Sequence, residues 1–169
     1  YQIKPLLPYF QAIHTFSIDD ISEIEKVSKA PVELLHLFCN DCYQQDTEVE
    51  KDIDICFVGS WSGPIYQGRR AMLRVAGALS RKFGWNFVVI GVGGFRTPLQ
   101  FIRDFFVSRG FRRFIRPGPL THEQINNLYQ RSKIVINSPL DNQKTAFPMR
   151  TFEVPGSGTC LVTEYMRGI

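Results

Sequence analysis

The chain has 169 residues, of which 44% are hydrophobic and 13% aromatic, a composition typical of a folded globular domain that excludes a disordered chain. Its net charge of +4 is mild and 16 acidic residues are interspersed, so charge alone favours neither a nucleic acid nor an anionic small molecule as partner. The sequence contains no run of 18 apolar residues and no signal peptide, so we expect no transmembrane segment.

Residues 1–50 contain few long apolar runs. Ser17 is placed to cap a helix that we expect from about Asp19 to Lys29, and an acidic run from Asp46 to Asp54 follows. We assign residues 1–50 to the end of a preceding domain and a linker.

The ends of the chain shape the expected domain organisation. The sequence begins at Tyr1 rather than Met and stops abruptly after Ile169. We therefore expect a piece of a longer protein that lacks an N-terminal domain of the same parent chain. Residues 51–169 then form one domain, truncated at its C-terminus.

From residue 51 onward, short apolar runs alternate with stretches of helical periodicity. The predicted strands cover 53–58, 86–92, 112–115, 134–136 and 159–163, and the predicted helices cover 69–83, 97–110, a stretch beginning at 121, and 148–154. Gly84 is placed to end the first helix, and Thr121 with Gln124 forms a capping-box pattern. This alternation predicts a Rossmann-like, doubly wound parallel sheet, in which ligands bind beyond the carboxyl ends of the strands.

Several signatures of other site types are absent from the sequence. No GxGxxG follows the first predicted strand, which disfavours ordinary NAD binding, and no GxxxxGK[ST] occurs, which excludes a P-loop. The three histidines are scattered and predict no metal site: His14, His36 and His122. Residues 109–116 interleave four arginines with two phenylalanines, but we interpret them as a strand with polar flanks and expect no nucleic-acid partner.

The four cysteines carry no clear chemistry. Cys39 and Cys42 have the spacing of a metal or redox motif, but no second pair or His cluster completes a site, so we interpret them as incidental thiols. Cys56 and Cys160 fall in predicted strands and are expected to be small buried residues. This usage fits a reducing, cytoplasmic compartment.

Arg150 and Glu153 lie three residues apart at the start of a predicted helix, so they share one face. An arginine beside free helix N–H groups can hold a diphosphate, and a carboxylate one turn further can accept hydrogen bonds from a ribose diol. The spacing alone fits an exposed pair on a surface helix at least as well as it fits a diphosphate and ribose site.

Three stretches near the C-terminus are informative together: YQRSKIVIN at 129–137, MRTFE at 149–153 and GSGTCLVTE at 156–164. They resemble the C-terminal domain of group 1 glycosyltransferases, enzymes with two facing Rossmann domains, and the similarity is nearest to the spore-maturation-protein branch. Residues 54–60 and the pair Arg69–Arg70 also resemble the start of that domain. The resemblance implies the nucleotide-sugar donor-binding half of such an enzyme.

The resemblance also implies roles for residues of the domain. Arg150 and Glu153 would be the catalytic pair, with Arg150 at the diphosphate and Glu153 at the ribose. A second glutamate is usual eight residues before Glu153, and this chain departs from the family by having Thr145 there. The remaining donor-binding positions are Gly59 and Ser60 near the diphosphate or acceptor, Arg69 and Lys144 as phosphate contacts, Leu120 in the loop that reads the nucleobase, and Asn137 at the start of the loop that ends at Thr145.

The mechanism implied by this resemblance is retaining, metal-independent sugar transfer from a nucleotide-sugar to an unknown acceptor, without a cofactor. Arg150, a basic neighbour and helix N–H groups would stabilise the leaving nucleoside diphosphate. Two alternatives stay open: a non-catalytic Rossmann-like interaction module, and a nucleotide-sugar epimerase. A response-regulator-like domain is set aside because Gly59-Ser60 and Arg116-Pro117 stand where its acidic residues belong.

Overall fold

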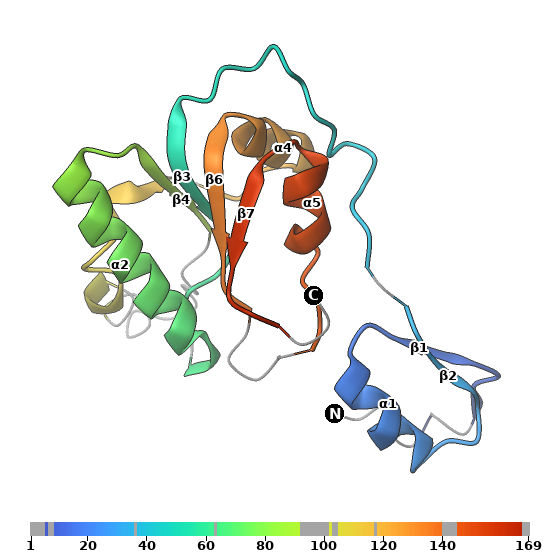
Figure 1. Cartoon of the computed structure of the whole chain (residues 1–169). Coiled ribbons are helices and arrows are strands. Elements are labelled where there is room, and N and C mark those ends of the chain that lie inside the picture. The colour runs from blue at the N-terminus through green and yellow to red at the C-terminus, as the bar shows by residue number, and fades with distance from the viewer. Residues whose placement is uncertain are drawn as a thin grey trace.

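Five parallel strands form the centre of the protein, a computed structural model that describes residues 6, 9–35, 37–62, 64–91, 102, 105–116, 118–139 and 145–166 (Figure 1). The strands are β3 (Ile53–Val58), β4 (Phe87–Ile90), β5 (Ile115–Arg116), β6 (Ser132–Asn137) and β7 (Cys160–Thr163). Their spatial order is β5-β4-β3-β6-β7, and Ile55 of β3 pairs with Phe87 on one side and Ile134 on the other. The strand order therefore reverses between β3 and β6, a topological switch point.

Helices cover both faces of this sheet (Figure 1). The helix α2 (Gln67–Phe83) lies on one face, after the short turn η2 (Pro64–Tyr66), and α4 (His122–Gln130) and α5 (Arg150–Gly156) lie on the other. Alternate residues of β3 enter the two cores: Phe57 packs with Leu73 of α2, and Cys56 packs with Val154 of α5. The predicted doubly wound Rossmann-like sheet is confirmed.

Two local signals act as predicted. Gly84 adopts the left-handed conformation, with φ of 71°, and ends α2. At the start of α4, the Thr121 hydroxyl accepts from the Gln124 N–H, and the Gln124 side chain accepts from the Thr121 N–H. The glycine at the end of α2 and the capping box at the start of α4 satisfy backbone groups that lack partners within the helix. These two features therefore determine where each helix stops or begins.

Two predictions at the strands were wrong. Residues 112–115 do not form a strand, because Arg112–Phe114 make a turn of 3-10 helix, η3, and only Ile115–Arg116 pair with β4. Cys160 is exposed rather than buried, since it lies on the edge strand β7. Cys56 is buried as expected, and burial raises the pKa of its thiol to about 12, which makes it unreactive.

The helix predicted over 97–110 lies partly outside the described residues. Ile102 and 105–107 are helical, and a turn follows at 108–111. Within the described part of the chain, no helix is long and apolar enough to cross a membrane.

A small N-terminal unit precedes the sheet. It consists of β1 (Ile13–Thr15), α1 (Ile18–Glu25) and β2 (Val32–Leu34), and its two strands pair in parallel. The expected helix to Lys29 thus ends at Glu25, and Ser17 stands at its start without a side-chain bond to the helix. Figure 1 shows this unit to one side of the five-stranded sheet, joined to it by a long connection.

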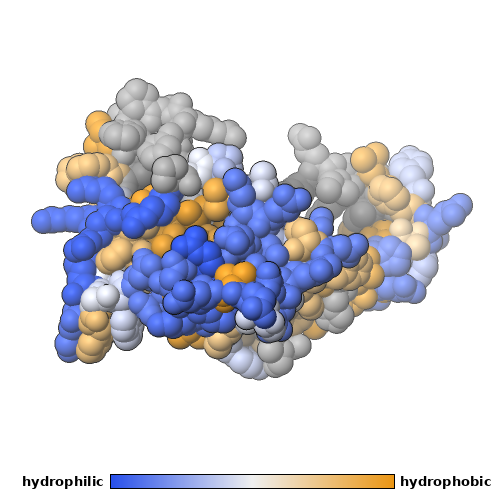
Figure 2. Space-filling model, turned by 90° about the horizontal axis from the view of Figure 1, so that it is seen from above, coloured by the Kyte–Doolittle hydropathy of each residue, from blue (hydrophilic) through white to orange (hydrophobic). Residues whose placement is uncertain are grey.

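The amino-terminal edge of the sheet is polar. Arg131 forms two hydrogen bonds with the Asp52 carboxylate, and the Lys133 ammonium lies 2.7 Å from Asp54. Figure 2 views the molecule from this edge and shows it predominantly hydrophilic. A binding site is therefore better sought at the opposite, carboxyl edge.

Candidate functional site

The carboxyl ends of β3 and β6 open onto a cavity of about 290 Å³. Gly59 and Ser60 follow β3, and Ser138 and Pro139 follow β6, so the cavity stands at the switch point of the sheet. Its lining combines two arginines with polar and small apolar residues: Ser60, Tyr66, Arg69, Pro139, Ala146, Pro148 and Arg150. The described residues include no group of three acidic, His or Cys side chains that could hold a metal ion.

Arg69, on the first turn of α2, connects the two strand ends. Its Nε donates to the Ser138 carbonyl at 3.0 Å and its Nη1 to the Ser60 carbonyl at 2.7 Å. The side chain is 6% exposed, and its guanidinium lies 4.9 Å from the centroid of the Tyr66 ring. Arg69 thus fixes the geometry of the cavity and contributes a positive charge to its wall.

Arg150, the first residue of α5, lines the same cavity but comes from a helix on the opposite face of the sheet from α2. A side chain at Gly59 would place its Cβ 3.4 Å from Nη2 of Arg150 and 3.2 Å from the Phe57 ring. Gly59 has φ of 152°, a backbone conformation that favours glycine, and the neighbouring side chains leave little room for a Cβ. The Nε of Arg150 is buried and has no hydrogen-bond partner among the described residues.

Glu153 is enclosed rather than presented at the surface. Its side chain is 7% exposed, and it hydrogen-bonds the Tyr43 hydroxyl, which lies 2.9 Å from Nδ1 of His122. Burial raises the pKa of Glu153, while the nearby charges of Arg150 and His122 and the Tyr43 hydrogen bond oppose that shift. The pair Arg150–Glu153 is therefore not an exposed surface pair.

Thr145 connects this region to the N-terminal unit. Its buried hydroxyl donates to Oδ2 of Asp19 at 2.8 Å and lies 3.2 Å from the Ser17 hydroxyl. Ser17 also forms an antiparallel bridge with Ala146, a cavity-lining residue. The first turn of α1 thus rests on the segment that forms one wall of the cavity.

The structure brings some of the predicted site residues together and separates others. Ser60, Arg69 and Arg150 line the cavity, and Gly59 lies against the guanidinium of Arg150. Thr145 lies next to the lining, through Ala146. Asn137 is 1% exposed and donates to Thr163 on β7, and Leu120 packs against the core on the α4 side. Lys144 lies outside the described residues.

Several residues at this site were not singled out from the sequence, among them Tyr66, Ser138, Tyr43 and His122. Tyr66 and Ser138 stand directly beside predicted site elements, and a search of every residue at the strand ends would have included them. Tyr43 lies about 80 residues before its partner His122, and no local pattern indicates that contact. Cys39 and Cys42 are free thiols, as expected.

The sequence matches the glycosyl transferase-like family over residues 69–169. No curated protein matches the sequence. Among solved structures, TarM, which is from S. aureus, is similar with a TM-score of 0.64 and 12% identity, over 98% of this chain and 32% of that one. AviGT4, a glycosyltransferase involved in avilamycin A biosynthesis, has a TM-score of 0.59 and 17% identity, over 91% of this chain and 46% of that one.

A third similar structure is the pneumococcal O-GlcNAc transferase GtfA, in complex with UDP and GlcNAc. Its TM-score is 0.60 and its identity 11%, over 95% of this chain and 31% of that one. At these identities the likeness establishes the fold. The chain spans about a third of the length of the first of these structures.

Proposed function

Because the chain belongs to the glycosyl transferase-like family, we propose that it is the donor-binding half of an enzyme that moves a sugar from a nucleotide-sugar to an acceptor. The observation that carries this proposal is the cavity at the switch point of the sheet, lined by two arginines from different elements. Arginine is the side chain best suited to a diphosphate, because its planar donors match phosphate oxygens.

The diphosphate would lie in the cavity, held by Arg150 and by the charge of Arg69. The Arg69 guanidinium already donates hydrogen bonds to two carbonyls, whereas the Nε of Arg150 has no hydrogen-bond partner among the described residues. Arg150 therefore has more donor capacity left for a ligand. A developing negative charge on the leaving nucleoside diphosphate would be stabilised there without a divalent ion, as in metal-independent retaining transfer.

Glu153 would accept hydrogen bonds from the ribose, one helical turn from Arg150. In the free protein its carboxylate is satisfied by the Tyr43 hydroxyl. A ribose diol offers the same kind of donor, so it would share or replace that bond. GtfA in its complex holds UDP and GlcNAc, which supports testing uridine nucleotides first.

The experiment is calorimetry of the full chain with UDP, GDP, ADP, CDP and their sugar conjugates. We expect one nucleoside diphosphate to bind, and Arg150→Ala to weaken that binding at least tenfold, since a hydrogen-bonded charge contact contributes roughly 1.5–3 kcal/mol. Arg131→Ala, which removes an arginine from the opposite edge of the sheet, is the matched control and should leave affinity unchanged. Equal effects of the two variants would contradict the site.

The same titration separates the proposal from a non-catalytic interaction module. A specific observation favours that second candidate: Thr145, where a glutamate is usual in the resembling family, is already engaged by Asp19 and Ser17. A module that kept only the fold would bind none of the nucleotides. A binding domain that awaits an acceptor-side partner would bind nucleotide but release no sugar.

A further inference from the structure

Charge is distributed unevenly along this chain. Residues 55–122 contain 11 of the 20 Lys and Arg and only one of the 16 Asp and Glu, Asp104. This stretch carries a net charge of +10, while the remainder carries −6. The total of +4 is therefore the sum of a strongly basic stretch and an acidic remainder. Of the basic residues in that stretch, Arg69 is the one that lines the cavity among those the structure describes.

Two described parts of the basic stretch, α2 and the segment 105–113, pack against each other. Arg74 of α2 donates to the Val107 carbonyl at 3.3 Å, and Arg81, two turns further, donates to the Gly110 carbonyl at 2.6 Å. Between them, Gly77 packs so closely on this turn that a Cβ there would lie 2.6 Å from the Gly110 oxygen. The outward-facing residues of α2 and of 105–113 thus belong to the same surface.

Two phenylalanines project from that surface. Phe105 is 46% exposed and Phe106 is 67% exposed, and their rings meet edge to face with centroids 5.8 Å apart. The guanidinium of Arg112 lies over the Phe105 ring at 3.7 Å. We define the basic–aromatic patch as these residues and their exposed basic neighbours: Arg74, Phe105, Phe106, Arg109, Arg112 and Arg113.

We propose that the basic–aromatic patch binds the surface of an anionic lipid bilayer. Phenylalanine has no polar tip and gains by entering the boundary between headgroups and acyl chains, while the surrounding guanidiniums contact lipid phosphates. Ile102, which is helical and 55% exposed, is a further exposed apolar side chain near these phenylalanines in the sequence. The single acidic residue in the stretch leaves little like-charge repulsion against such a surface.

A single-stranded nucleic acid fits the patch less well. Its bases bind by stacking on open aromatic faces. Here Arg112 already covers one face of Phe105, and the edge-to-face contact with Phe106 fills a further side. Two exposed rings among exposed arginines suit insertion between lipid headgroups better than stacking on bases.

The test is co-sedimentation of the full chain with vesicles of phosphatidylcholine alone and with about 30% phosphatidylglycerol. We expect binding to the anionic vesicles only, with affinity falling as salt is raised, because the attraction decays within a Debye length. Arg112→Glu with Arg113→Glu should weaken binding at least tenfold, since each basic residue near such a surface contributes a factor of about five. Phe105→Ser with Phe106→Ser should weaken it by a similar factor.

Matched controls come from the same chain. Phe83→Ser changes a phenylalanine of α2 that is 54% exposed but lies outside the patch, and Lys26→Glu with Lys29→Glu reverses two charges on the N-terminal side. Circular dichroism verifies that each variant is folded. Binding to neutral vesicles as tight as to anionic ones, equal loss in the control variants, or tighter binding of a single-stranded RNA that displaces the vesicles would each overturn the proposal.

This inference is independent of the proposed sugar transfer. Arg150→Ala, which should weaken nucleotide binding at least tenfold, is expected to leave vesicle binding unchanged, because Arg150 lines the cavity and is not part of the patch. The two proposals can therefore fail separately.

Discussion

Arg150 and Glu153 stand one turn apart on α5 and have different surroundings. The arginine lines the cavity above Gly59, whereas the carboxylate is enclosed by Tyr43 from the long connection and by His122 of α4. Burial of the carboxylate disfavours its charged form, and its raised pKa records that cost. Two side chains on one helix face can thus serve different parts of a ligand.

A pH-dependent stability follows from Glu153. Because its pKa is raised above the ordinary value of 4.5, the folded state binds a proton more tightly than the unfolded state does. The resulting stabilisation is complete below that ordinary value and is lost as pH rises through the folded pKa. We therefore expect Glu153→Gln to match the original protein near pH 4 and to be more stable than it near pH 7, by urea unfolding.

The control for this prediction is Glu123→Gln, which changes an exposed glutamate on the first turn of α4. It should show no such growth of the stability difference with pH. If the difference for Glu153→Gln is the same at both pH values, the carboxylate does not titrate in the way its burial requires.

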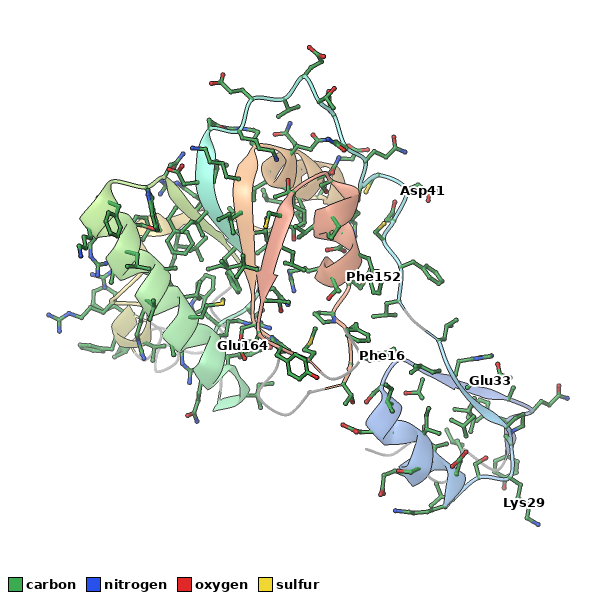
Figure 3. All side chains as sticks on the ribbon, in the orientation of Figure 1. Phe16, Lys29, Glu33, Asp41, Phe152 and Glu164 are labelled. Carbon is green, nitrogen blue, oxygen red and sulfur yellow. The ribbon has the colours of Figure 1, made fainter. Side chains whose placement is uncertain are left out.

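The contact between α1 and the 145–148 segment couples two elements far apart in sequence. Asp19 accepts a hydrogen bond from Thr145, and Ser17 pairs with Ala146 in the cavity wall. The wall of the cavity therefore rests partly on the N-terminal unit. Figure 3 shows Phe16, which precedes α1, on the side of that unit that faces the sheet domain.

We expect Asp19→Ala to loosen the cavity wall. The change removes one acceptor from the buried Thr145 hydroxyl, a loss of about 1 kcal/mol, so amide hydrogen exchange in 145–149 should accelerate about fivefold. Nucleotide affinity should fall by a similar factor if the wall positions Arg150. Asp20→Ala, in the same turn of α1, leaves the hydrogen bond between Thr145 and Asp19 in place, so it is the control and should change neither quantity. Unchanged exchange in Asp19→Ala would show that the contact does not hold the wall.

Two hydrophobic cores, one on each face of the sheet, stabilise the whole molecule. The core on the α2 side contains Leu73, which is fully buried, while Val75, two residues along the same helix, is 59% exposed. The N-terminal unit adds little to either core, since no residue of α1 is buried. Global stability should therefore depend on the sheet and its covering helices.

Leu73→Ala should lower the free energy of unfolding by about 3 kcal/mol, because it leaves a cavity in a packed core. Val75→Ala on the same helix should change it by less than about 0.5 kcal/mol. Urea unfolding followed by circular dichroism compares the two. A similar small loss in both variants would mean that the α2 side of the sheet is not a packed core.

The sequence by itself determined the parallel sheet, the alternation of its strands with helices, the end of α2 and the start of α4, because hydrophobic periodicity and capping depend on residues close in the chain. It also indicated the helix that begins at Arg150, since the carboxyl edge follows from the topology, whereas Arg69 was named only through the family resemblance. It failed at 112–115, which was predicted as a strand, because only Ile115 and the following Arg116 pair with β4.

Only the tertiary structure decided how those residues meet. Arg69 joins the carbonyls of Ser60 and Ser138, Tyr43 closes over Glu153, and Asp19 reaches Thr145 from more than a hundred residues away. None of these contacts leaves a local signal, because each joins segments whose proximity depends on the packing of the complete sheet. The sequence therefore locates the site, and the fold determines which side chains line it and which are enclosed.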